Sequence, residues 1–129
     1  MILHFSLEFL TRAARVISPR VNANSATTDT SISMLAGNYI IERVIVTNAT
    51  TSLTTATAGL FTAAGGAGTT LCSDQPLTPL TANTKWLELA PRLVLGTDRF
   101  TNGSLFFRIG TAQGGAATLD VYIFGRSLT

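Results

Sequence analysis

The chain has 129 residues, of which 46% are hydrophobic and only 12% are charged, and its formal net charge is +2. This length suits one domain, and the charged fraction is about half of what a soluble globular domain usually carries. The small charge excess excludes a strongly basic nucleic-acid-binding protein, and no apolar run is long enough to span a membrane as a helix. A surface with so few charges indicates that another subunit covers part of it.

Residues 2–9 alternate between apolar and polar side chains, which is the period of a half-buried strand. A competing helical spacing runs from Leu3 to Ile17. We favour an extended arm over 2–9 and a helical turn over 10–17, which Ser18-Pro19 ends. The polar stretch after it is typical of a connector. The expected division is an arm at 1–20, a connector at 21–28 and a sandwich domain at 29–129.

After the connector, short strand-like runs alternate with turn residues, and no segment keeps a helical period. The run 39–47 is apolar on both faces except at Glu42 and Arg43, which predicts a strand inside a sheet, covered above and below. The glycine-rich stretch 65–68 lacks the Lys-Ser/Thr of a phosphate loop, so we interpret it as a turn. Further strands are expected at 31–34, 55–63, 69–73, 85–89 and 92–95.

The last expected element is a hairpin, with strands at 104–112 and 116–125 joined by Gln113-Gly114-Gly115. About eight short strands at a spacing of roughly 8–12 residues describe a sandwich or barrel. We therefore predict an all-β fold, a single antiparallel β-sandwich that is jelly-roll-like and carries an N-terminal arm. An immunoglobulin-like sandwich is the alternative.

The sequence offers few groups for catalysis. His4 is the only histidine and Cys72 the only cysteine, so a nucleophile-histidine arrangement would depend on a side chain in the terminal arm, where it cannot be held in position. A zinc site lacks ligands as well. We expect no enzyme activity, no catalytic residue, no metal and no cofactor, and we expect Cys72 to be a core residue.

The carboxylates leave two interpretations open. Glu42 and Glu88 could form a glycosidase pair on neighbouring strands, but ion pairs of Glu42 with Arg43 and of Glu88 with Lys85 are the stronger interpretation. Calcium would need convergence through tertiary structure, because no calcium-loop spacing is present. The residues to check for calcium are Asp29, Asp74, Asp98 and Asp120.

Three stretches resemble small virion proteins of tailed bacteriophages: Tyr39 to Ala49, the Thr/Ala/Gly-rich run that follows to Leu71, and the ending from Phe106 to Leu128. The resemblance covers residues 27–129 and includes head-decoration or cement proteins and small tail components. It implies a β-rich module, often trimeric, made in the host cytoplasm and clamped onto the outside of a capsid. Its expected partners are its own copies and the major capsid protein, with no nucleic acid and no membrane.

We place the expected interface in the arm, because an alternating segment can add a strand to the edge of a neighbour's sheet and arginine is favoured at interfaces. The candidate interface residues are Leu3, Phe5, Leu7, Phe9, Arg12 and Arg15. The alternative function is a receptor- or glycan-binding module of a phage tail or fibre. That function predicts an exposed aromatic side chain, Trp86 or Tyr122, beside Asp or Asn, whereas we expect Trp86 to pack in the core or to anchor an interface.

Overall fold

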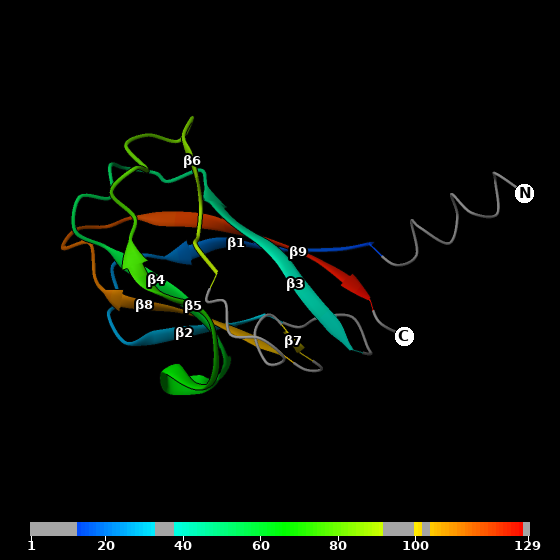
Figure 1. Cartoon of the computed structure of the whole chain (residues 1–129). Helices are drawn as coiled ribbons and strands as arrows, with labels where there is room; N and C mark the ends of the chain where they lie inside the picture. The colour runs from blue at the N-terminus through cyan, green and yellow to red at the C-terminus, as the bar shows by residue number, and fades with distance from the viewer. Residues whose placement is uncertain (1–12, 33–37, 92–99, 102–103, 128–129) are drawn as a thin grey trace, which may run out of the picture.

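Two antiparallel β-sheets pack face to face in the computed structural model, which describes residues 13–32, 38–91, 100–101 and 104–127 (Figure 1). The first sheet has the order β1-β9-β3-β6, with the short β7 also paired to β3. Its strands are β1 (Ala13–Asn22), β9 (Thr118–Ser127), β3 (Tyr39–Thr47), β6 (Trp86–Glu88) and β7 (Phe100–Thr101).

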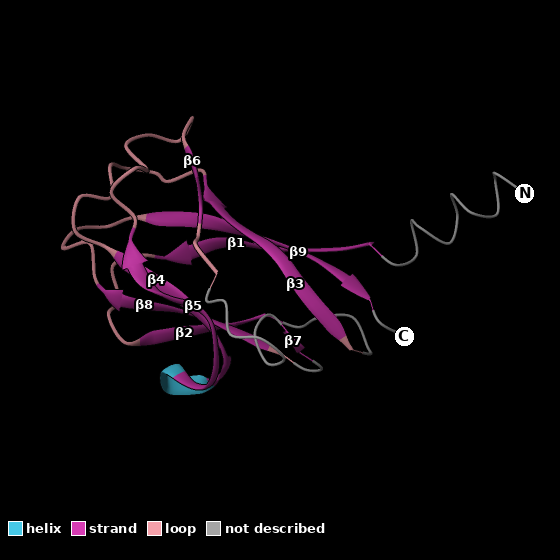
Figure 2. Cartoon of the chain, viewed as in Figure 1, coloured by secondary structure: helices cyan, strands magenta, loops and turns pink. Residues whose placement is uncertain are grey.

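The second sheet has the order β2-β8-β4-β5. Its strands are β2 (Thr28–Ile32), β8 (Leu105–Thr111), β4 (Thr57–Ala63) and β5 (Ala67–Pro76). A 3-10 turn, Ala64–Gly66, joins β4 to β5 and is coloured as the helix in Figure 2. The glycine-rich stretch is therefore a turn, as predicted.

The strand pairing is that of a rolled-up hairpin. The antiparallel pairs β4·β5, β3·β6, β2·β8 and β1·β9 are nested one outside the other along the sequence. Successive strands alternate between the two sheets except that β4 and β5 both lie in the second sheet and β6 and β7 both lie in the first. This is the connectivity of a jelly roll, so the predicted fold is confirmed, and the immunoglobulin-like alternative does not describe the strand order.

The core lies between the sheets and is supplied by alternate residues of each strand. Strand β9 contributes Leu119, Val121 and Ile123, and β8 faces it with Phe107 and Ile109, all of them buried. Each such side chain contributes roughly 1.5–3 kcal/mol of hydrophobic free energy. The period-2 pattern read from the sequence therefore identifies the inward face correctly.

The expected hairpin at 104–125 is wrong. Strands β8 and β9 belong to different sheets, since β8 pairs with β2 and β4, and β9 pairs with β1 and β3. Both strands bury one face in the same core, but from opposite sides of it. Alternation is satisfied equally by two paired strands and by two strands that face each other across a core, which explains the error.

The expected arm and connector also need correction. Residues 13–20, assigned to the arm, and 21–22, assigned to the connector, form β1, which pairs with β9. The helical turn expected over 10–17 is therefore wrong for 13–17, because the long edge of β9 offers hydrogen-bond partners that override local helical spacing. The remaining arm residues lie outside the described residues, as do the strand expected at 92–95 and residues 33–34 of the strand expected at 31–34.

Gly125 marks a tight contact in the middle of the first sheet. A β-bulge shifts the register between β3 and β9 at Ile41 and Arg43. A Cβ atom added at Gly125 would lie only 2.7 Å from the backbone oxygen of Ile40. The bulge brings two backbones too close for any side chain at this position.

Gln113 fastens the loop between β3 and β4 to the β8–β9 connection. Its Oε1 accepts hydrogen bonds from the backbone N–H groups of Thr55 and Ala56, both at 3.1 Å. Its Nε2 donates to the backbone oxygen of Ser52 and to Oγ1 of Thr54, also at 3.1 Å. One side-chain amide thus satisfies four polar groups of this loop.

Candidate interaction face

The first sheet has a second face, which points away from the core. Register places its outward side chains in rows across the strands, with Ile45 opposite both Glu88 and Tyr122, Arg43 opposite Phe124, and Thr47 opposite both Trp86 and Asp120. We call this surface the outer face. Its residues are Trp86, Glu88, Arg43, Ile45, Thr47, Asp120, Tyr122 and Phe124.

The centre of the outer face is apolar. Ile45, Tyr122 and Phe124 are half-buried, and none of them belongs to the core cluster between the sheets. Large apolar side chains on a solvent-facing sheet surface are typical of a surface that binds another molecule. Strand β3 is an interior strand, as predicted, but the expected second covering layer is not among the described elements.

Two ion pairs flank the apolar centre and form a rim that carries both positive and negative charges. Arg43 Nη2 lies 2.9 Å from Glu88 Oε1, with the two side chains 51% and 39% exposed, and Arg126 Nε lies 3.7 Å from Glu42 Oε2. Such exposed pairs contribute little to stability. An apolar centre inside a charged rim is instead the anatomy of a protein interface.

Trp86 stands at the edge of this face and is 60% exposed, the only large hydrophobic side chain that is exposed among those described. The core position considered for it is therefore wrong. Its neighbour Leu87 packs against the core, and because side chains alternate along a strand, Trp86 and Glu88 point outward. Exposed tryptophan is a frequent anchor of binding surfaces.

Asp120 joins two positions with left-handed backbone angles, Arg20 at the bulge of β1 and Asn48 just after β3. Its Oδ1 accepts a hydrogen bond from the backbone N–H of Arg20 at 2.8 Å, and its Oδ2 accepts one from Asn48 Nδ2 at 2.9 Å. Arg20 and Asn48 both have left-handed backbone angles, with φ of 56° and 57°, which non-glycine residues rarely adopt. The carboxylate thus serves as an anchor for β1 and for the end of β3.

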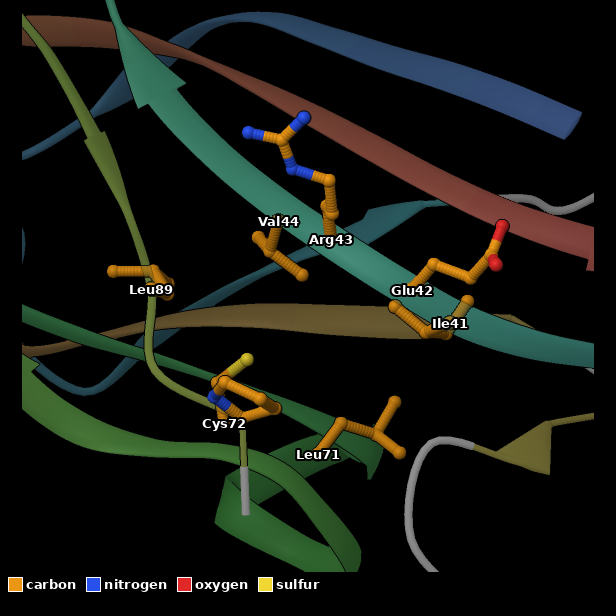
Figure 3. Close-up of a pocket in the computed structure, with 8 residues that line it drawn as sticks. Ile41, Glu42, Arg43, Val44, Leu71, Cys72 and Leu89 are labelled. Carbon is orange, nitrogen blue, oxygen red and sulfur yellow. The ribbon is translucent and has the colours of Figure 1, made fainter. Parts of the chain in front are cut away.

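A narrow hollow opens between β3 and β5, and Leu89 and Pro91 also line it (Figure 3). Its empty volume is about 230 Å³, including space open to solvent. Leu71 and Cys72 line its floor, and the side chains of Glu42 and Arg43 are directed away from them in Figure 3. Cys72 is buried, as predicted, and burial raises the pKa of its thiol to about 12. The thiol stays protonated near neutral pH, so it is a poor nucleophile.

The remaining carboxylates are spread over separate contacts. Asp29 accepts hydrogen bonds from Gly65 N at 2.8 Å and from Arg108 Nη1 at 3.2 Å, and Asp74 accepts one from Thr57. Asp98 lies outside the described residues. In the described ranges, no three His, Cys, Asp or Glu side chains gather closely enough to hold a metal ion.

The two glutamates considered as a glycosidase pair are each engaged with an arginine. Glu42 pairs with Arg126, and Glu88 pairs with Arg43. Ion pairing was the favoured interpretation, but the partners differ from those expected, because the sheet register brings Arg43 across from β6.

The interface residues proposed from the sequence fall mostly outside the described structure. Leu3, Phe5, Leu7, Phe9 and Arg12 belong to residues 1–12, and Arg15 lies on β1 with its backbone opposite Phe124 of the outer face.

The residues of the outer face that the sequence reasoning missed are Ile45 and Phe124, and Tyr122 was named only for the glycan-binding alternative. The available signal was the apolar character of both faces of 39–47, which we assigned to coverage within the domain.

Comparison with known proteins adds no family: no protein-family model and no curated protein matches the chain. The described residues contain no helix that is both long and apolar enough to cross a membrane.

Proposed function

We propose that this chain is a virion structural protein, a capsid decoration or cement protein that binds the outer capsid surface and stabilises it through contacts between subunits. Its partners are the major capsid protein and its own copies, in a homo-oligomer such as a trimer. The observation that carries the proposal is the outer face, an apolar centre with a charged rim on a jelly-roll sandwich. Jelly rolls recur in viral capsid and lectin domains.

The chemistry of the outer face suits a protein surface as partner. Its aromatic side chains and Arg43 are the residue types that dominate binding energy at interfaces, while the rim carries both signs of charge and so fixes orientation rather than attracting a uniformly charged polymer. A capsid repeats the same junction many times. Modest contacts at each junction add up to a strongly stabilised shell through multivalency.

Binding to particles tests the proposal. Capsids that lack the protein are mixed with wild-type chain or with the Trp86→Ala/Tyr122→Ser variant, and bound protein is measured by co-sedimentation. We expect the variant to bind at least roughly tenfold more weakly, since hot-spot truncations cost about 2 kcal/mol or more. Thr51→Ala, at an exposed loop residue, is the matched control. Undiminished binding by a folded double variant contradicts docking through the outer face.

A receptor- or glycan-binding module is the second candidate, and the exposure of Trp86 favours it. A sugar ring could stack on the indole, and the same row holds the Thr47 hydroxyl and the Asp120 carboxylate. A glycan array with specific hits that vanish in Trp86→Ala and persist in Trp86→Phe supports this function. Hits that are the same in both variants argue against it.

A further inference from the structure

Within the described residues, four strands form the ends of the two sheets: β1 and β6 in the first sheet, and β2 and β5 in the second. The 2-residue β7, which pairs with β3, is too short to hold another strand. A free edge carries backbone N–H and C=O groups that can pair with a strand from another chain. The four edges differ in length and in how far other groups of the chain cover them.

Three of these edges are poor acceptors of a new strand. Strand β6 has only 3 residues and β2 only 5. Strand β5 is longer, but Gln75 near its end holds Ala90 against it, with Nε2 donating to the Ala90 oxygen at 3.2 Å and Oε1 accepting from the Ala90 N–H at 2.9 Å. Its register to β4 is also repeatedly shifted.

Strand β1 offers the most regular edge. It has 10 residues, and its register to β9 is unbroken from Ala13 to Ser18. Among the described strands it pairs with β9 alone. Natural proteins usually blunt such an edge or cover it, which indicates that the edge of Ala13–Ser18 has a partner in the assembled protein.

The twelve residues that precede β1 fit this edge. Extended at roughly 3.3 Å per residue, they reach about 40 Å, which is longer than the edge. Their alternation would place Leu3, Phe5, Leu7 and Phe9 on one face of the enlarged sheet and the polar residues between them on the other, as in a sheet with one face on a core.

The strand should come from a second copy rather than from the same chain. To fold back onto its own β1, the segment would have to turn at Leu10-Thr11-Arg12. These residues include none of the Gly, Asn, Asp or Pro residues that tight hairpin turns favour. An extended passage to a neighbouring copy needs no turn.

We infer that residues 1–12 of a second copy add a strand to the free edge of β1, so that copies of the chain assemble by exchanging their N-terminal segments. This inference deepens the proposed self-association and rests on it, whereas docking on the capsid uses the outer face and is tested separately by particle binding. An edge-pairing partner is held by main-chain hydrogen bonds, and its alternate side chains give specificity.

Self-association of the full chain is measured by light scattering over a range of concentrations. We expect deletion of residues 1–12 to weaken it by roughly tenfold or more while the unfolding transition stays in place, since an added strand supplies several hydrogen bonds and apolar contacts. Proline is tolerated where an edge N–H faces outward, and neighbouring strand residues point their N–H groups in opposite directions. Of Val16→Pro and Ile17→Pro, the variant that removes an outward-facing N–H should therefore fold normally and fail to assemble, because it lacks a hydrogen-bond donor to the added strand.

Cross-linking identifies the occupant even if both proline variants unfold. Tagged chains carrying Ser6→Cys are mixed with untagged chains carrying Val16→Cys and treated with a flexible bismaleimide. Cys72 does not interfere, because its side chain is buried and shielded from the reagent. We expect mixed dimers, and far fewer when Thr51→Cys replaces Val16→Cys. The absence of mixed dimers overturns the inference, and so does a doubly substituted Ser6→Cys/Val16→Cys chain that cross-links only within itself; neither result affects the outer-face proposal.

Discussion

Removing the Gln113 amide should measurably destabilise the sandwich at a loop. Gln113→Met keeps the length of the side chain and deletes all four hydrogen bonds to residues 52–56. A neutral hydrogen bond contributes about 0.5–1.5 kcal/mol net, and water can reach some of the released groups. The free energy of unfolding should therefore fall by about 2–3 kcal/mol in total.

Urea denaturation followed by tryptophan fluorescence measures this change. With a slope of about 1–3 kcal/mol per molar urea, the midpoint should fall by roughly 1 M. Gln113→Glu keeps the acceptor and loses both donors, so it should lie between Met and wild type, while Thr51→Ala in the same loop should stay within about 0.5 kcal/mol of wild type. A Gln113→Met protein as stable as the Thr51→Ala control refutes the reasoning.

Three further predictions concern the close backbone contact at Gly125, the buried thiol of Cys72 and the ion pair between Arg108 and Asp29. Gly125→Ala should lower the free energy of unfolding by about 1–3 kcal/mol because a backbone oxygen blocks the new methyl group, while Gly115→Ala, where nothing lies within 4 Å, should be nearly neutral in the same urea titration. Folded protein should resist thiol reagents at buried Cys72. Because burial raises the folded pKa of Cys72 from 9.0 to about 12, the free energy of unfolding should fall as pH rises between these values, and this loss should be absent in Cys72→Ala. Equal slopes of unfolding free energy against pH in the two proteins contradict this. Arg108→Met should cost about 1–3 kcal/mol by leaving the Asp29 carboxylate without its cation, and a double-mutant cycle with Asp29→Asn that shows no coupling counts against the pair.

The sequence predicts the inward faces because strand alternation is local. Leu119, Val121 and Ile123 were assigned to one face, and all three are buried. Sheet membership is not local. The pairing of β1 with β9 joins residues about a hundred positions apart, and no pattern within residues 13–22 reveals that partner.

The candidate site was less predictable than the fold for the same reason. The apolar outer residues Ile45 and Tyr122 become neighbours only through the register of β3 with β9. The exposure of Trp86 depends on the direction of a strand of 3 residues, whose alternation is too short to read from the sequence. The charges were readable as ion pairs, but their partners are fixed by register.

The position of β9 has a consequence for synthesis on the ribosome. This strand is the last of the described strands in chain order, yet it lies in the interior of the first sheet, between β1 and β3 (Figure 1). Neither neighbour can complete its pairing until residues 118–127 have been made, and such long-range pairing is intrinsically slow. A chain truncated before residue 118 would therefore lack both the outer face and a properly supported β1 edge, so only copies that contain residues 118–127 would be competent to assemble.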